Sequence, residues 1–344
     1  MSHTPDSTRA LVVTQLGNKF RDVTEIRSVP LSTPPRGHVL VKNKFLGMNA
    51  SDINYTSGWY DPAHTPPMTA GMESLGEVVA VGDGVSLKVG QCVVVLNFGS
   101  FAELVSQPVE KLVPVPSMDP ALMSIVVSGL TASISLEQEA DLKEGKTVLV
   151  TAAAGGTGQF AVQIAKMAGC HVIGTCSTPE KCEFLKNIGC DRVINYKTEK
   201  VGDVLKKEYP QGLDVVYECI GKEMFDVCLE NLAVKGRLIV IGAVSDYQRS
   251  DMADRSAMVS KLPVSLMCLH KSASVRGFFL RHYSDQFTTH IGKLMSMYLE
   301  GTLKVTQDNG CQAAAGPFKG LEKLADAHDH MFSGKNIGKV IVEI

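Results

Sequence analysis

The residues most directly suited to chemistry form a glycine-rich turn that begins at residue 151. An apolar run, VLV, leads into the turn, and the apolar-periodic stretch GQFAVQIAKMAG follows it. Small residues fill the three positions of a GxGxxG-type turn, where the backbone must approach a pyrophosphate closely. The N–H groups that open the following helix would face the phosphates. This pattern predicts dinucleotide contacts from Ala153, Gly155, Gly156, Thr157 and Gly158; the alternative is a tight strand-to-helix turn without a ligand.

The end of the next strand indicates which nicotinamide cofactor the turn would serve. NAD-binding versions place an Asp or Glu about 20 residues after the turn, where it accepts a hydrogen bond from the ribose 2′-hydroxyl. Here the segment reads Thr175-Cys176-Ser177, without a carboxylate. Ser177 and Lys181 would instead accommodate a 2′-phosphate. We therefore expect NADP(H), although a lysine in this place could also be a solvated helix residue.

The elements that must position these residues fall into two regions. Residues 10–115 contain short β-rich runs punctuated by Gly and Pro, typical of a mostly antiparallel β domain. Strand-like and helical stretches then alternate, which predicts an α/β fold with a parallel, doubly wound sheet. A final helix and the strand-like GKVIVEI are expected to return to the first domain. We predict a catalytic domain of residues 1–122 and 303–344 and a nucleotide-binding domain of residues 123–302. The polar, weakly periodic segment 246–263 is expected to be an irregular loop bordering the ligand.

Composition narrows the class of protein. The 344 residues carry a formal charge of −2 and no sustained Lys/Arg stripe, which argues against a nucleic-acid or anionic-membrane partner. Nine cysteines without a CxxC pair favour reduced, packed thiols in an intracellular compartment. The sequence has neither a signal-peptide pattern nor 18 consecutive apolar residues. We expect a soluble, cytoplasmic protein with a small-molecule substrate.

The chain resembles the medium-chain dehydrogenase/reductase superfamily over almost its whole length. The resemblance rests on SDINYTSGWYDP, GMESLGEVVAVGDGV, GSFAEL, SGLTA, TAAAGGTGQFA and GKNIGKVIV. Within the superfamily, the quinone oxidoreductase and prostaglandin reductase branches look nearest. The resemblance implies a GroES-like catalytic domain and a Rossmann NADP-binding domain. Vertebrate relatives end in a peroxisomal signal of the Ser-Lys-Leu type, whereas this sequence ends in Val-Glu-Ile.

The segments that match the family's zinc motifs lack the zinc ligands. Zinc-dependent members resemble CxTD followed by GHE, whereas this chain has Asn49-Ala50-Ser51-Asp52 and Gly71-Met72-Glu73. The four-cysteine structural lobe is also missing, because no cysteine lies between Cys92 and Cys170. His328 and His330 point in different directions on a helix, so we expect a solvated surface there. We predict no metal site, and alcohol oxidation would lack its Lewis acid.

A nicotinamide site without zinc can still reduce a conjugated C=C bond, because the carbonyl of an enone accepts the charge. The protein must then stabilise an enolate oxygen, and a phenol can donate a hydrogen bond or a proton to it. Tyr247 matches a tyrosine of the prostaglandin reductases and is the first candidate. Tyr55 resembles the tyrosine of the quinone reductases and is the second. Without the resemblance, either would be read as a packing residue. Asn49 could orient the nicotinamide or serve only as a turn residue.

The resemblance implies further cofactor contacts, a two-fold assembly and a substrate. The other cofactor contacts are Tyr196, Cys219, Ile241, Phe278, Phe279, Leu280 and Asn336. The strand-like KSASVRGFF would form the last strand of the nucleotide-binding sheet and pair with its twin in a homodimer. We expect reduction of the 13-double bond of 15-oxo-prostaglandins. A general quinone or alkenal reductase and a non-catalytic NADPH-binding protein are the alternatives.

Overall fold

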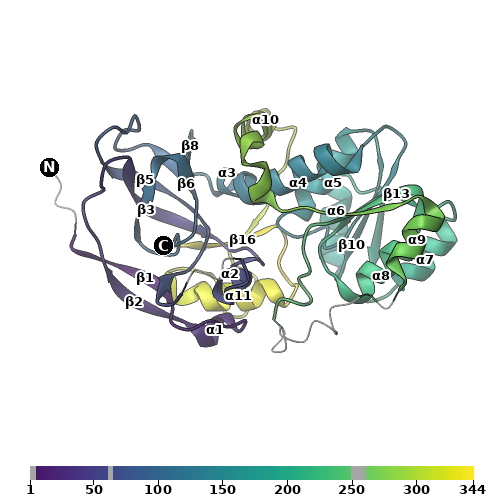
Figure 1. The fold of residues 1–344 in the computed structure, drawn as a ribbon, viewed down its shortest axis with the longest axis horizontal. Coiled ribbons are helices and arrows are strands. Elements are labelled where there is room, and N and C mark those ends of the chain that lie inside the picture. Colours follow the sequence, from purple (N-terminus) through teal and green to yellow (C-terminus); the bar gives the residue numbers. More distant parts are fainter. Residues whose placement is uncertain (1–4, 61–64, 249–259, 261) are drawn as a thin grey trace. The chain divides into compact units, whose positions relative to one another are not determined.

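The computed structural model describes residues 5–60, 65–248, 260 and 262–344 (Figure 1). The chain divides into two units, which are considered separately. Unit 1 contains Met1–Val127 and Gln307–Ile344, and unit 2 contains Ser128–Thr306. Most of the predicted irregular loop at 246–263 lies outside the described residues.

Unit 1 is built from two β-sheets. The smaller sheet has the strand order β2-β1-β4, and the larger has the order β15-β16-β3-β5-β6-β8, with β7 also paired to β3. Within the described residues these strands are β1 (Ser7–Val13), β2 (Thr24–Pro30), β3 (His38–Gly47), β4 (Met68–Thr69), β5 (Glu73–Val81), β6 (Cys92–Leu96), β7 (Leu104–Pro108), β8 (Leu112–Val115), β15 (Gln307–Asp308) and β16 (Lys339–Glu343). The pairing of β16 with β3 is antiparallel, so the C-terminal segment completes the N-terminal sheet, as predicted.

Strand β1 separates two apolar cores in unit 1. Because side chains alternate along a strand, Ala10 and Val12 enter one core, while Leu11 and Val13 enter the other. The first core lies among the valines of β3, β5 and β6. The second is closed by helices, with Phe20 and Leu324 among its buried members. The helices of unit 1 are α1 (Phe20–Val23), α2 (Asp52–Thr56), α3 (Pro120–Ser124) and α11 (Leu324–Phe332).

Unit 2 is built on a parallel six-stranded sheet of order β11-β10-β9-β12-β13-β14. The order reverses next to β9, which is the arrangement of a doubly wound nucleotide-binding fold. The strands are β9 (Thr147–Val150), β10 (His171–Cys176), β11 (Arg192–Asn195), β12 (Leu213–Glu218), β13 (Leu232–Val240) and β14 (Ser274–Gly277). The predicted α/β fold class is therefore confirmed, and β14 is the last strand of the sheet, as expected.

Helices cover both faces of this sheet. Alternate residues of β10 face opposite sides: Ile173 joins the core formed with α7, α8 and α9, whereas Gly174 faces Leu185 of α6. Helix α5 packs against β9 and β10. The helices of unit 2 are α4 (Leu130–Ser135), α5 (Gly158–Met167), α6 (Pro179–Asn187), α7 (Val201–Glu208), α8 (Lys222–Glu230), α9 (Val264–Lys271) and α10 (Phe287–Leu299).

One helical stretch, Pro120–Ala140, is long and apolar enough to cross a membrane by length and composition alone. However, 78% of its most apolar window is buried inside the structure, as is typical of a core helix in a folded domain. The length and composition of this stretch are therefore only weak evidence for a membrane span.

The glycine that begins α5 gives a test of the packing between strand and helix. A Cβ at Gly158 would lie 2.5 Å from the Ala152 carbonyl oxygen and 2.7 Å from that of Ala153. Because both contacts are to backbone, Gly158→Ala should lower the free energy of unfolding by about 1–3 kcal/mol. As a control, Gly292→Ala in α10 meets no atom within 4 Å and should stabilise by up to about 1 kcal/mol. Urea unfolding measures both, and equal effects of the two substitutions would contradict this account.

Candidate functional site

The predicted cofactor residues of unit 2 gather at the carboxyl ends of its parallel strands. In an open α/β sheet, ligands bind outside these strand ends, next to the point where the strand order reverses. The glycine-rich turn follows β9, Ser177 follows β10, Tyr196 follows β11 and Cys219 follows β12. Ile241 and Phe278 follow the last two strands of the sheet. A parallel sheet thus brings together residues more than 120 positions apart in the sequence.

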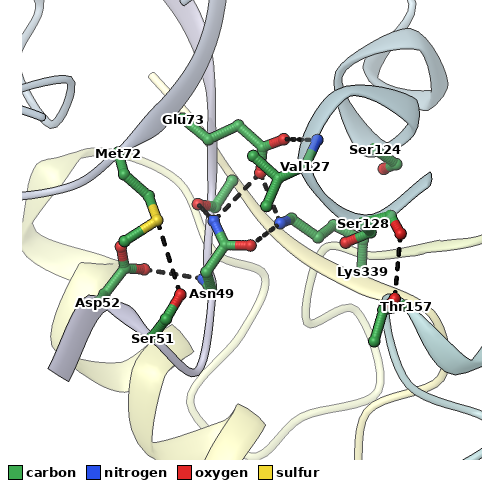
Figure 2. Close-up of polar contacts among 12 residues, drawn as sticks. Asn49, Ser51, Asp52, Met72, Glu73, Ser124, Val127, Ser128, Thr157 and Lys339 are labelled. Atoms are coloured by element: carbon green, nitrogen blue, oxygen red, sulfur yellow. Dashed lines mark hydrogen bonds and ion pairs between the residues drawn. The ribbon is translucent and has the colours of Figure 1, made fainter. Parts of the chain in front are cut away.

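The turn after β9 has the tight geometry that a bound pyrophosphate requires. Ala152 has a φ of +47°, and the Gly155 N–H donates to the Ala152 carbonyl at 2.9 Å. A Cβ at Gly155 would lie 3.1 Å from the same oxygen. The Thr157 hydroxyl is engaged inside the protein, 3.0 Å from the Ser128 carbonyl oxygen and 2.7 Å from the Tyr217 hydroxyl (Figure 2 draws the first contact). If the turn binds a phosphate as predicted, the contact at Thr157 would come from its backbone N–H.

The next two strand ends form the predicted 2′-phosphate region. The Tyr196 N–H donates to the Cys176 carbonyl at 3.0 Å, which joins the ends of β10 and β11. Lys181 lies in the first turn of α6 and is only 7% exposed, so it is not the solvated lysine of the alternative reading. Thr178 caps this helix, with its side chain accepting from the Lys181 N–H at 3.3 Å. Tyr196 is exposed, and the Lys197 ammonium lies 5.5 Å from its ring centroid.

Backbone hydrogen bonds tie the ends of β12, β13 and β14 together. The Ile241 N–H donates to the Glu218 carbonyl at 2.8 Å, and the Phe278 N–H donates to the Val240 carbonyl at 3.0 Å. The Cys219 carbonyl accepts from the Val244 N–H at 3.1 Å. Phe278 is buried and stacks on Tyr283, with 4.8 Å between the ring centroids. The predicted contacts Cys219, Ile241, Phe278, Phe279 and Leu280 therefore share one edge of the sheet.

Tyr247 lies in the turn that follows β13, close to this edge. Its hydroxyl oxygen accepts a hydrogen bond from the Ala243 N–H at 3.1 Å. A Cβ at Gly242 would lie 2.9 Å from the same oxygen, so the glycine leaves room for the phenol. An oxygen that accepts from a backbone N–H can still donate its own proton, and the N–H stabilises the negative charge left behind.

Sequence reasoning missed Glu218, a fully buried carboxylic acid at the end of β12. It accepts from the Ile220 N–H at 2.7 Å and from the Gly221 N–H at 3.1 Å. Burial raises the pKa of Glu218 to about 7, despite these hydrogen bonds. The carboxyl group shapes the loop that carries Cys219. An acidic residue directly after the run Val215-Val216-Tyr217 was the only signal available in the sequence.

Unit 1 holds a second buried polar cluster, centred on Lys339 (Figure 2). The Lys339 ammonium lies 2.5 Å from the Glu73 carboxylate and donates to the Asn49 side-chain oxygen at 2.5 Å. Lys339 is 2% exposed and Glu73 is 0% exposed. The Asn49 amide also donates to Glu73 and to the Gly47 carbonyl, at 3.2 Å each. The Val127 N–H donates to the other Glu73 oxygen at 3.1 Å. The Asn49 side chain is therefore committed to this cluster.

Asp52 adjoins the cluster and is also buried. One of its oxygens accepts from the Asn49 N–H at 2.8 Å, and the other has no hydrogen-bond partner among the described residues. Burial raises the pKa of Asp52 to about 7, although the Asn49 N–H and Lys339 both oppose this shift. At neutral pH the protonated and the ionised forms of this carboxyl group are therefore both populated.

The residues that occupy the matching zinc-ligand positions do not fit a zinc ion. Zinc in proteins takes thiolate, imidazole or carboxylate ligands. Here an amide, Asn49, and a thioether, Met72, replace Cys and His, and the Ser51 hydroxyl points to the Met72 sulfur at 3.6 Å. The Lys339 ammonium would also repel a cation beside Asn49. Across residues 5–60, 65–248, 260 and 262–344, no three His, Cys, Asp or Glu side chains form a group that could hold a metal ion.

The two remaining predicted residues of unit 1 are both buried. Tyr55 is 4% exposed and stacks on Phe98, with 4.1 Å between the ring centroids. Asn336 is 8% exposed and donates to the Gly338 carbonyl at 2.9 Å, within its own turn. Stacking on Phe98 gives Tyr55 a packing role, which was the alternative to a catalytic one. Tyr55 therefore remains the second catalytic candidate.

The prediction of a solvated surface at His328 and His330 was wrong for His328. This residue is 1% exposed, and its ring stacks on Phe20, with 4.3 Å between the centroids. Burial lowers the pKa of His328 and favours the neutral ring. His330 lies 3.0 Å from Asp308 and is partly buried. Helix α11 therefore turns His328 into the core of unit 1, because an aromatic ring can pack there as an apolar group.

Two family models match the chain, one in each unit. The model described as alcohol dehydrogenase GroES-like domain matches residues 35–117, and the one described as zinc-binding dehydrogenase matches residues 156–296. The first lies in unit 1 and the second in unit 2.

Individual relatives match over nearly the full chain. Prostaglandin reductase-3 of Mus musculus is 51% identical, over 99% of this chain and 90% of its own length. A probable quinone oxidoreductase of Leishmania amazonensis is 43% identical, over 99% of both chains. The solved structure of a mycobacterial protein in complex with NADPH superposes with a TM-score of 0.82 at 27% identity, covering 98% of this chain and 100% of that one.

The ion pair of unit 1 can be tested with a double-mutant cycle. Removing one member of a buried pair strands the other charge, so Glu73→Gln and Lys339→Met should each cost about 3–5 kcal/mol of unfolding free energy. The double variant should cost less than the sum of the two. As a control, Lys44→Met removes an exposed partner of Glu343 and should cost under about 1 kcal/mol. Strictly additive costs for Glu73 and Lys339 would show that the two groups are not coupled.

Asp52 makes the stability of unit 1 depend on pH. Its folded pKa is raised to about 7, so between about pH 4 and 7 the unfolded chain loses this proton first and folding becomes less favourable as pH rises. Asp52→Asn removes this titration. The variant should therefore match wild type near pH 4 and exceed it by about 4 kcal/mol at pH 8, because each pKa unit of the shift is worth about 1.4 kcal/mol. Urea unfolding across this range measures the difference, and the exposed Asp83→Asn serves as the control. A difference independent of pH would refute the assignment.

Proposed function

The chain belongs to the medium-chain dehydrogenase/reductase superfamily, and on that premise we propose that it is an NADPH-dependent reductase of the conjugated C=C bond of α,β-unsaturated ketones. The proposed substrates are 15-oxo-prostaglandins, reduced at the 13-double bond. The observation that carries this proposal is the replacement of the zinc-ligand positions by Met72 and by Asn49, which accepts a hydrogen bond from a buried ammonium. A carbonyl substrate must then be activated by a hydrogen-bond donor, which suits an enone.

The residues of unit 2 that would hold the cofactor follow from the strand-end geometry. The turn from Ala153 to Gly158 would bind the pyrophosphate through backbone N–H groups, since side chains there would clash with backbone oxygens. Ser177, Lys181 and Tyr196 would contact the 2′-phosphate and adenosine. Cys219, Ile241 and the segment 278–280 would border the ribose and nicotinamide. The reduced nicotinamide, when bound, supplies a hydride to the β-carbon of the enone.

The proposed role of Tyr247 is to stabilise the enolate oxygen and then to supply a proton. Its hydroxyl can donate to that oxygen while it accepts from the Ala243 N–H. This backbone bond also fixes the direction of the phenol. Tyr55 is the second candidate, but its ring is stacked on Phe98 and only 4% of the residue is exposed. The geometry therefore favours Tyr247.

The likeness to prostaglandin reductase-3 favours a 15-oxo-prostaglandin substrate. The likeness to a probable quinone oxidoreductase keeps a general quinone or alkenal reductase as the second candidate. We also propose a homodimer in which β14, the edge of the unit 2 sheet, pairs with its twin. Cytoplasmic localisation is proposed as well, supported by a sequence with nine cysteines and no CxxC pair.

The first measurement is the oxidation of NADPH by the purified protein with 15-oxo-prostaglandin E2, with identification of the 13,14-dihydro product. Tyr247→Phe keeps the ring and loses the donor, so kcat should fall by about 100-fold or more. Tyr209→Phe is the matched control, because Tyr209 bonds His171 near the start of β10, and it should retain the activity of the wild type.

The outcomes of this assay separate the candidates. No turnover of the prostaglandin, together with turnover of quinones or short alkenals, would support the second candidate. NADPH binding without turnover of any of these compounds would support a non-catalytic protein. Full activity of Tyr247→Phe alongside a loss in Tyr55→Phe would assign the proton donor to Tyr55.

A further inference from the structure

Two cysteine thiols meet within the proposed 2′-phosphate region. Cys176 ends β10, and Cys182 lies in α6. Their sulfur atoms are 3.2 Å apart, and both thiols are reduced in this structure. The spacing is Cys-x5-Cys, so no CxxC motif marked the pair in the sequence. The contact arises because the turn at 177–178 reverses the chain from the strand into the helix.

We infer that Cys176 and Cys182 form a site of reversible oxidation, at which a hydroperoxide converts the pair to a disulfide and thereby weakens NADPH binding. The loss of binding rests on the proposed function, because it depends on the 2′-phosphate contacts of Ser177 and Lys181. The formation of the bond itself does not.

The two thiols differ in access to solvent, which sets the order of the steps. Cys182 is half-buried, whereas Cys176 is 3% exposed. Peroxide therefore reacts first with the Cys182 thiolate: an S–O bond forms, the O–O bond breaks, and a sulfenic acid and hydroxide result. The Cys176 sulfur then attacks the Cys182 sulfur. The S–S bond forms, the S–O bond breaks, and hydroxide leaves as water with the Cys176 proton.

The overall reaction is balanced. Two thiols and one hydrogen peroxide give one disulfide and two waters, with two electrons passing from the sulfurs to the O–O bond. A dithiol or two glutathione molecules reverse it by thiol–disulfide exchange. Burial raises the pKa of Cys176 to about 12, so its thiolate is scarce at neutral pH. We therefore expect the second step to be slow.

The bond would close a ring around the residues that select the cofactor. Residues 176–182 include Ser177, the capping Thr178 and Lys181. A disulfide is about 1 Å shorter than the present sulfur separation of 3.2 Å. Cys176 is held at the end of β10 by its pairing with Asn195 of β11. The movement must therefore fall on the first turn of α6, which carries Lys181.

The alternative partner for Cys176 is Cys190, which is also buried. Cys190 is 8% exposed, so peroxide reaches it less readily than Cys182. Nearly all the linkage should therefore involve Cys182, and Cys190→Ala should leave it intact.

Peptide mass spectrometry tests the bond directly. The full-length protein is treated with hydrogen peroxide, its remaining thiols are blocked, and it is digested with trypsin without reduction. Peptides 167–181 and 182–186 should appear joined, two hydrogen atoms lighter than their sum. Fragmentation should assign the link to Cys176 rather than Cys170. Absence of this linked pair would overturn the proposal, whatever the protein binds.

Titration with NADPH and NADH tests the consequence. Loss of one charge-assisted hydrogen bond to the 2′-phosphate should raise the Kd for NADPH about 10-fold after oxidation and leave the Kd for NADH nearly unchanged. Dithiothreitol should restore the original value. Cys182→Ser should bind NADPH like wild type and be insensitive to peroxide, whereas the exposed Cys311→Ser should keep the response.

The two possible failures are distinguishable. A linked peptide pair with an unchanged NADPH Kd would overturn the effect on binding. Equal Kd values for NADPH and NADH in the reduced wild-type protein would instead refute the 2′-phosphate contacts of the proposed function.

Discussion

The buried Lys339 ammonium is the interaction on which the arrangement of unit 1 depends. It joins strand β16 to Glu73 of β5 and to Asn49, which follows β3. A buried charge is tolerated only with a close, hydrogen-bonded partner, so the three groups must stay in register. Both the nitrogen and the oxygen of the Asn49 side-chain amide are hydrogen-bonded within unit 1. Asn49, which matches a zinc-ligand position in the resemblance, is thus part of an internal electrostatic support in this chain.

This support has a consequence for the chemistry. An ammonium fixed by a neighbouring carboxylate cannot bind a substrate oxygen as a Lewis acid would. Under the proposed function, activation of the carbonyl would fall to hydrogen-bond donors such as the phenol of Tyr247, whose oxygen is oriented by the Ala243 N–H. A conjugated carbonyl suits this arrangement, because hydride addition at the β-carbon places the charge on an oxygen that a neutral donor can stabilise.

Unit 2 shows how the cofactor region and a reactive thiol pair share one turn. The chain leaves β10 at Cys176 and enters α6 through the Thr178 cap, which places Cys182 one helical turn further on. The same reversal that carries Ser177 and Lys181, the proposed 2′-phosphate contacts, brings two sulfurs to 3.2 Å. Cofactor selection and sensitivity to oxidants would then be properties of one short segment.

The sequence by itself determined the order of strands and helices, the dinucleotide turn and the lack of a carboxylate after β10, because local patterns of glycine, apolar residues and charge specify these features. It also predicted the return of the C-terminal strand to the first sheet. Only the tertiary structure decided contacts between distant residues. The Lys339–Glu73–Asn49 cluster spans 290 positions, and no local pattern distinguishes a buried lysine from a solvated one. The burial of His328 was missed for the same reason. Helical spacing tells which side of the helix a residue lies on, but not which residues pack against that side. The thiol pair, too, became visible only when the turn placed both sulfurs together.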